Sequence, residues 1–229
     1  MVNMMKLDWL GMRTYRSRLV ISVLSAIGWG VLIDTRFILP YLIWGMFDAS
    51  LYCFDAEEKG KLNQLYLTLP ISRGTLISAR YVLSLILQLI GIAAGIAFTF
   101  IFSRIMYGRK LLNQHNFIPT PESLAIIACI CLLFCALLSL VIHPILHRLG
   151  YAKAKIIGYA LPMYGSIILI VVLIQVIARV ESVGEFMSSA LQWALGNNLL
   201  VSALILGVTA LVLVASYTLS LKMYARRDF

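Results

Sequence analysis

The sequence predicts an all-α protein that crosses a membrane six times. Of its 229 residues, 61% are hydrophobic and only 13% are charged, whereas soluble domains average about 45–50% apolar and about 25% charged residues. The hydrophobic residues form long runs that are separated by short polar stretches. Because about 20 apolar residues suffice for a helix to span the hydrocarbon core, these runs indicate a polytopic membrane protein rather than a soluble domain.

The apolar runs divide the chain into six expected spans within a single transmembrane domain, residues 1–229. Residues 1–18 precede them and have the pattern of an amphipathic entry helix at the membrane surface. The first span has only 15 residues, about 22 Å of helix. Either Arg16 and Arg18 extend their side chains to the interface, or the span returns early through residues 34–36. The expected spans are about 19–33, 37–54, 81–103, 122–142, 156–178 and 199–221.

The distribution of basic residues predicts the orientation of these spans. Both termini and the segments 55–80 and 143–155 lie on one side of a six-span arrangement, and they hold 14 of the 19 lysines and arginines. The three opposite loops hold the other five. The positive-inside rule therefore places both termini and residues 55–80 in the cytoplasm. This topology explains the net charge of +9 without nucleic-acid binding.

Residues 55–80 are the most polar internal segment, and they have a helix pattern of their own. Asp55 and Glu58 have the spacing of a capping box at a helix start. Pro70 is expected to end this helix, and Ser72 can cap the next one. The helix, clamped between two spans, suits the docking of a cytoplasmic partner, or alternatively the shielding of lipid headgroups. Its apolar stripe consists of Leu62, Leu65, Tyr66 and Leu69.

A second short helix is expected between the last two spans, at residues 182–195. Ser182 and Glu185 repeat the capping-box spacing, and Gly196 is expected to end the helix. The helix also has an apolar face. This face consists of Val183, Phe186, Ala190 and Ala194.

A few polar side chains fall inside the apolar runs. Asp48 is the only acid there, and it either pairs with a basic residue such as Arg18 at the interface or lines a pathway. Gln88 and Gln175 are expected to form hydrogen bonds between helices, with pathway lining as the alternative. Gly91 and Gly95 have the GxxxG spacing of a close helix contact.

Motifs for chemistry within this chain are not found. The sequence has no GxxxxGK[ST] phosphate loop, no HExxH and no GxSxG, so an enzyme is not expected. His143 and His147 are one helical turn apart but have no third ligand nearby, so we expect no metal site. The four cysteines lie in apolar runs and are interpreted as small buried side chains.

Two blocks of the sequence resemble signatures of the ATP-binding-cassette (ABC) type 2 permeases. The segment FDAEEKGKLNQLYLTLPISRGTLISARYVLSL is similar to the cytoplasmic signature, although the tryptophan that often precedes LP is absent. The segment HPILHRLGYAKAKII is similar to a second signature of a bacterial subfamily. The matching residues are Phe54, Asp55, Leu69, Pro70, Ile71, Ser72, Arg73, Ala79, Arg80 and Tyr81 in the first block and Pro144, Gly150, Tyr151, Lys153 and Lys155 in the second.

The resemblance implies a permease subunit of an ATP-driven exporter in the bacterial cytoplasmic membrane. In such permeases the segment between the second and third spans holds a coupling helix that docks on a separate ATPase, and in this chain Ser72 and Arg73 belong to the same coupling segment. The stretch between the fifth and sixth spans often holds a re-entrant outer helix, so we expect the apolar face at 182–195 to pack at the exit of the translocation path. ATP and Mg²⁺ then bind to that ATPase, and this chain needs no cofactor. A second permease chain completes the path, and the substrates of this class are amphipathic peptides, bacteriocins, antibiotics or lipid-like compounds.

Two rival functions fit a six-span chain without an ATPase motif. One is the substrate-binding membrane subunit of a vitamin-type importer, and the other is a non-transporting immunity or scaffold protein. Neither rival needs the LPISR block, residues 69–73, next to a capped surface helix.

Overall fold

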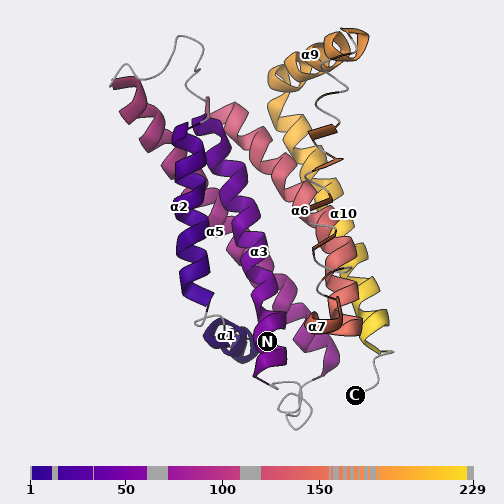
Figure 1. Ribbon diagram of the computed structural model, residues 1–229. Coiled ribbons are helices and arrows are strands. Elements are labelled where there is room, and N and C mark those ends of the chain that lie inside the picture. Colours follow the sequence, from indigo (N-terminus) through magenta and orange to yellow (C-terminus); the bar gives the residue numbers. More distant parts are fainter. Residues whose placement is uncertain are drawn as a thin grey trace. The chain divides into compact units, whose positions relative to one another are not determined.

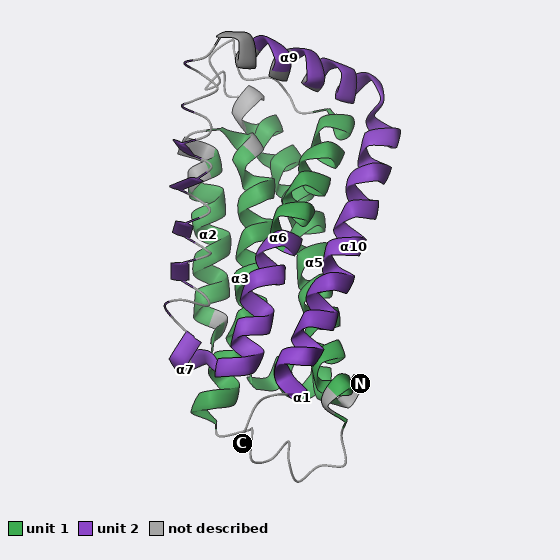
Figure 2. Cartoon of the chain, turned by 90° about the vertical axis from the view of Figure 1, so that its right-hand side faces the viewer, with its two compact units in different colours: residues 1–135 green, residues 136–229 purple. Residues whose placement is uncertain are grey.

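The protein is described here from a computed structural model (Figure 1). It describes residues 2–11, 15–32, 34–60, 72–108, 120–154 and 181–225, together with scattered residues between 156 and 179. Every element within these ranges is helical, which confirms the prediction of an all-α fold. The chain divides into two compact units, residues 1–135 and 136–229, which Figure 2 distinguishes by colour.

The first unit contains four principal helices and the beginning of a fifth. Helices α2 and α3 are joined through the short 3-10 helix η2, Thr35–Phe37, and α5 packs along α3 (Figure 1). With 17 residues, α2 has a length of about 26 Å, shorter than a hydrocarbon core of about 30 Å, as the sequence predicts for the first span. The helices are α1 (Val2–Gly11), α2 (Arg16–Leu32), α3 (Ile38–Lys59), α5 (Arg73–Gly108) and α6 (Pro121–Leu149).

The second unit contains the end of α6 and the helices α7 (Tyr151–Ala154), α9 (Glu181–Gly196) and α10 (Asn198–Ala225). Helix α9 confirms the short helix expected at 182–195. The capping role predicted for Ser182 is wrong, because Ser182 is the second residue of α9 rather than the residue before it. The helix ends at Gly196, as expected.

The GxxxG prediction is confirmed in the first unit. A Cβ atom added to Gly91 would lie 3.1 Å from the backbone oxygen of Leu42, and one added to Gly95 would lie 3.0 Å from the Cα atom of Leu39. Both values are closer than ordinary van der Waals contact, so α5 and α3 meet backbone to backbone at these glycines. The two helices form a seam that tolerates no larger side chain at either position.

The boundary of the fourth expected span is wrong. The sequence suggested a loop from 143 to 155, but α6 continues to Leu149 with Pro144 inside it. A proline removes one backbone hydrogen bond and often bends a helix without ending it. The helix ends instead at Gly150, whose φ of 76° favours glycine, and its N–H donates to the Leu146 carbonyl at 2.9 Å.

Three of the described helices are long and apolar enough to cross a membrane: Gly74–Ile105 within α5, α6 and α10. The total of six spans stays a prediction, because most of the expected fifth span, 156–178, lies outside the described residues. The three helices make the chain an integral membrane protein.

Candidate ATPase-coupling site

The predicted coupling segment 55–80 is divided among three parts of the chain. Residues 55–59 are the last turn of α3, and residues 73–80 are the first two turns of α5. Residues 61–71 lie outside the described residues. They include Leu62, Leu65, Tyr66, Leu69 and Pro70, so the predicted apolar stripe stays a prediction.

The predicted capping box at the start of this segment is wrong. Asp55 lies inside α3, which runs on to Lys59, so neither Asp55 nor Glu58 begins a new helix. The second cap is confirmed. The Ser72 hydroxyl accepts a hydrogen bond from the Thr75 N–H at 3.2 Å, and the Ser72 carbonyl accepts one from the Leu76 N–H at 3.3 Å. Ser72 therefore caps α5, which begins at Arg73.

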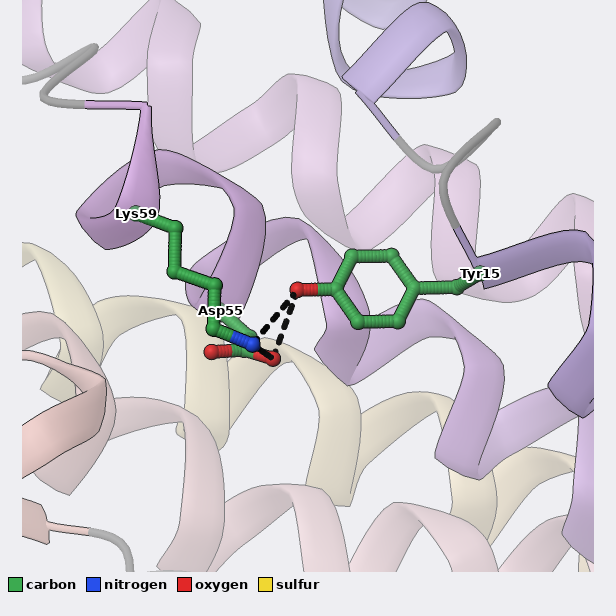
Figure 3. A network of polar contacts seen from close by, with 3 residues as sticks. All are labelled: Tyr15, Asp55 and Lys59. Atoms are coloured by element: carbon green, nitrogen blue, oxygen red, sulfur yellow. Dashed lines mark hydrogen bonds and ion pairs between the residues drawn. The ribbon is translucent and has the colours of Figure 1, made fainter.

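Asp55 joins the end of α3 to the residues that precede α2. Its Oδ2 accepts a hydrogen bond from the Tyr15 hydroxyl at 2.6 Å and one from the Lys59 ammonium at 2.8 Å (Figure 3). Lys59 also donates to the Tyr15 hydroxyl at 3.3 Å. The carboxylate thus has a neutral donor from one element and a cation from its own helix, and the three side chains close a small ring of contacts.

The electrostatics of this ring keep Asp55 ionised. Burial of the Asp55 carboxyl opposes its ionisation, but the hydrogen bonds from Lys59 and Tyr15 outweigh this effect and lower its pKa. The pKa of Tyr15 is raised by burial and by its hydrogen bond to Asp55. The pKa of Lys59 is raised mainly by its hydrogen bond to Asp55. At neutral pH the ring therefore contains a carboxylate, an ammonium and a neutral phenol.

A stack of aromatic rings extends this ring of contacts along α3. The rings of Tyr15 and Tyr52 are stacked with their centroids 5.1 Å apart. The Arg18 guanidinium lies 5.2 Å from the Tyr15 centroid and 5.5 Å from the Tyr52 centroid, within the range of a cation–π contact. The Tyr52 hydroxyl donates to Asp48 Oδ2 at 2.7 Å. Asp48 is therefore connected to Arg18 through Tyr52.

Arg80 forms a second, more deeply buried cluster. Its Nη2 donates to Glu57 Oε2 on α3, and its Nε lies 3.9 Å from Asp8 Oδ2 on α1. The exposed fraction of the side chain is 3% for Arg80, 4% for Glu57 and 2% for Asp8. The Phe54 ring covers the guanidinium at 4.5 Å from its centroid. The cluster joins α1, the end of α3 and the start of α5.

The remaining predicted site residues are not members of these two clusters. Gln88 is buried on α5, and its Nε2 donates to Ser84 Oγ of the same helix at 3.1 Å, whereas a bond to another helix was expected. Gln175 is exposed. On α9, Phe186 and Ala190 are exposed and Ala194 is half-buried. The side chain of Val183 lies outside the described residues.

The comparison with protein families agrees with the fold. A family model described as ABC-2 family transporter protein matches residues 3–225. The chain belongs to this family. Permeases of this family are membrane subunits of ABC transporters, and membership implies partnership with separate ATPase subunits. No curated protein and no solved structure matches the chain.

Sequence reasoning missed four members of the two clusters in this permease: Asp8, Tyr15, Glu57 and Lys59. One signal was available for the Glu57–Arg80 pair. Glu57 follows the second apolar run and Arg80 precedes the third, and adjacent antiparallel helices bring such positions together. Asp8 is the only acid among the first 18 residues, but its partner could not be identified without the direction of α1.

Proposed function

We propose that this permease is the membrane subunit of an ATP-driven exporter in the bacterial cytoplasmic membrane, with both termini in the cytoplasm. Two permease chains form a path between them, and ATPase subunits dock at the segment between α3 and α5. The substrates are amphipathic peptides, bacteriocins, antibiotics or lipid-like compounds. The family membership supports the transporter subunit, and the resemblance of the signature blocks supports the direction and the substrate class.

The Arg80–Glu57 ion pair is the observation that carries this proposal. It connects α3 and α5 at the two ends that flank residues 61–71. This buried ion pair opposes separation of the end of α3 from the start of α5. A force applied by a docked ATPase at 61–71 is therefore passed to α3 and α5 together.

Differential binding drives the cycle in this mechanism. The ATPase subunits bind the two conformations of the permease with different affinity when they hold ATP and when they hold ADP. A ligand can shift a conformational equilibrium only through such a difference. ATP binding and hydrolysis thereby alternate the populations in which the path is open to each side.

Helix α9 is proposed to help close the outer end of the path. The support comes from its confirmed helical structure and from the exposed Phe186 and Ala190 on a side that we expect to be extracellular. These side chains are available for contact with a second permease chain. A structure of the complete transporter in which α9 lies flat on lipid, away from the dimer axis, would refute this role.

Replacing Leu65 by aspartate tests the docking site. Burial of a leucine in a partner groove contributes about 1.5–3 kcal/mol, and an unpaired carboxylate in such a groove adds a further cost. We expect Leu65→Asp to abolish co-purification of the ATPase while expression of the permease stays normal. The change lies outside the expected spans, so folding in the membrane should be preserved.

Gln64→Asp is the matched control for this experiment. It introduces the same charge one residue away, on another face of the predicted helix, and should leave ATPase co-purification near the wild-type level. If Leu65→Asp retains the ATPase as well as Gln64→Asp does, the predicted stripe is not the docking surface. If the wild-type chain binds no ATPase subunit at all, the proposed exporter function fails as a whole.

A further inference from the structure

The Arg80 cluster contains more than a link between two neighbouring helices. Its third member, Asp8, lies on α1, which is separated from α3 and α5 along the chain by all of α2. The buried guanidinium therefore forms a hydrogen-bonded ion pair with α3 and a longer ion pair, without a hydrogen bond, with α1. The cluster has two carboxylates and one cation, so the loss of Arg80 leaves two buried acids without their shared partner.

Helix α1 has a second point of attachment near the cluster. A Cβ atom added to Gly11 would lie 3.5 Å from the Cβ atom of Ala56 on α3. Gly11 is about one helical turn beyond Asp8, and Ala56 is adjacent to Glu57. Met4, one turn before Asp8, is also buried. Three successive turns of α1 are thus packed within the first unit.

The physics of the cluster opposes the release of α1 during the transport cycle. Separating Asp8 from Arg80 would remove the ion pair between α1 and α5, and breaking one partner from a buried ion pair is strongly destabilising. The contact at Gly11 allows backbones to approach closely, and it would be lost by a small displacement. Both features favour α1 moving with α3 and α5 rather than against them.

We infer that Arg80 is a positioning residue that makes α1, the end of α3 and the start of α5 one rigid block, which moves as a unit while the transporter hydrolyses ATP. The inference rests on the proposed function, because the push on this block comes from the ATPase proposed to dock between α3 and α5. In this arrangement Arg80 contacts neither substrate nor nucleotide. It acts by keeping α1 docked, so that the push of an ATPase is shared by three helices.

A disulfide between α1 and α3 tests whether they move together. Cys53→Ala, Cys129→Ala, Cys131→Ala and Cys135→Ala first remove the native thiols, and Gly11→Cys with Ala56→Cys is then introduced. The 3.5 Å distance between the Cβ positions is within the range of a disulfide. The permease is purified with its ATPase in lipid nanodiscs, and permease-dependent ATP hydrolysis is measured under oxidising and reducing conditions.

We expect the disulfide to form readily and ATP hydrolysis to stay within about two-fold of the reduced sample. The single variants Gly11→Cys and Ala56→Cys are the controls for oxidation itself. A loss of ten-fold or more that is reversed by reductant would show that α1 must undock, and would overturn the inference. Failure of the disulfide to form would also overturn it, because the docked arrangement would then be absent.

A rescue experiment tests the role of Arg80 itself. The variant Asp8→Asn, Glu57→Gln and Arg80→Met removes the ion pairs without leaving a buried charge unpaired. We expect it to form the 11–56 disulfide at least five-fold more slowly and to lose most of its permease-dependent ATP hydrolysis when reduced. Closing the disulfide should restore that hydrolysis, since the covalent bond replaces the ionic link.

The outcomes separate the inference from the proposed function. If the neutral variant hydrolyses ATP normally, or if the disulfide does not restore the activity, Arg80 is not the positioning residue and the inference is wrong. A general folding defect would lower the yield and would not be corrected by one bond between α1 and α3. If the wild-type chain fails to bind an ATPase, the proposed function fails, and that result is visible before any variant is made.

Discussion

The two ends of α5 are held by chemically different contacts. Near its start, Arg80 is paired with Glu57 and Asp8 among side chains that are almost fully buried. Near its other end, the Ser103 hydroxyl donates to the Thr35 hydroxyl of η2 at 3.1 Å, and both residues are buried as well. The first contact is ionic and involves three helices, whereas the second is a single neutral hydrogen bond.

This difference indicates where the first unit can change shape. A buried ion cluster is costly to open because each freed charge loses its partner, whereas hydrogen bonds between membrane helices contribute little on average. The contact at the end of α5 next to residues 61–71, here called the stiff end, is therefore the more costly one to open. The hydrogen bond of Ser103, at the end here called the yielding end, is the less costly one.

Arg80→Met should lower the stability of the permease more than any other variant proposed here. It would remove the ionic contact that distinguishes the start of α5 from its other end. It removes the cation that Glu57 and Asp8 share, and removal of one partner from a buried pair typically costs about 3–5 kcal/mol. We expect a large drop in the thermal unfolding midpoint of the purified permease in detergent. Arg80→Lys, which keeps the charge but not the planar geometry, should be intermediate. An Arg80→Met protein as stable as the wild type would mean that the stiff end does not exist.

Gly95→Leu should lower the stability by the next largest amount, because it disrupts the close contact between α3 and α5 that lies between the two ends. The backbone of Leu39 lies 3.0 Å from the Cβ position at Gly95, so a larger side chain must push α5 away from α3. Overpacking of this kind costs about 1–3 kcal/mol, measured as a lower unfolding midpoint. Gly207→Leu on α10 is the matched control, since nothing lies within 4 Å of the Cβ position there. Equal effects of the two changes would contradict the close seam.

The sequence was sufficient for the helical fold, because apolar runs and the GxxxG spacing depend on local pattern. Gly91 and Gly95 could be identified as a contact, and Ser72 as a cap, from their neighbours alone. The chain near Asp55 could not be predicted in the same way. The spacing of Asp55 and Glu58 fits the start of a new helix and the interior of a continuing helix equally well. The hydrogen-bond partner of Asp55 is Tyr15, which is 40 residues away and cannot be identified from the local sequence.

The Arg80 cluster shows the same limit. Arg80 could be recognised as part of a signature, but its role depends on Asp8 and Glu57, which come from two other helices. Pairing across helices requires knowledge of direction and register, and neither is encoded in a local pattern. The predicted end of the fourth span failed for a related reason, because the surroundings of Pro144 rather than the proline itself decide whether a helix continues.

Asp55→Asn should lower the unfolding midpoint by a smaller amount that depends on pH. It tests how much the contacts of Asp55 add to the stability of the stiff end. The pKa of Asp55 is lowered in the folded protein, so its stabilising effect is complete above its ordinary pKa of about 3.9. The effect is lost as the pH falls through the folded-state value. At pH 7 we expect the unfolding midpoint of Asp55→Asn to lie about 2–4 °C below that of the wild type, and the difference should shrink below pH 4.

Tyr15→Phe is the companion variant for this ring of contacts. It removes the hydroxyl that donates to Asp55 but leaves the stacking on Tyr52. Its effect should be smaller than that of Asp55→Asn at pH 7, because Lys59 still pairs with the carboxylate. For Asp55→Asn itself, the contrary result is a difference in unfolding midpoint from the wild type that grows as the pH falls. That result would contradict a lowered pKa of Asp55.

Ser103→Ala should have the smallest effect, and it tests the yielding end directly. It removes the hydroxyl that donates to Thr35, and hydrogen bonds between membrane helices average about 0.6 kcal/mol in double-mutant cycles. A cycle of Ser103→Ala, Thr35→Val and the double variant, read from unfolding midpoints, isolates this contact from other effects of each substitution. A coupling energy as large as the effect of Arg80→Met would show that both ends of α5 are equally stiff. A small coupling energy would mean that the Ser103–Thr35 hydrogen bond opens at little cost, in contrast to the Arg80 cluster at the stiff end.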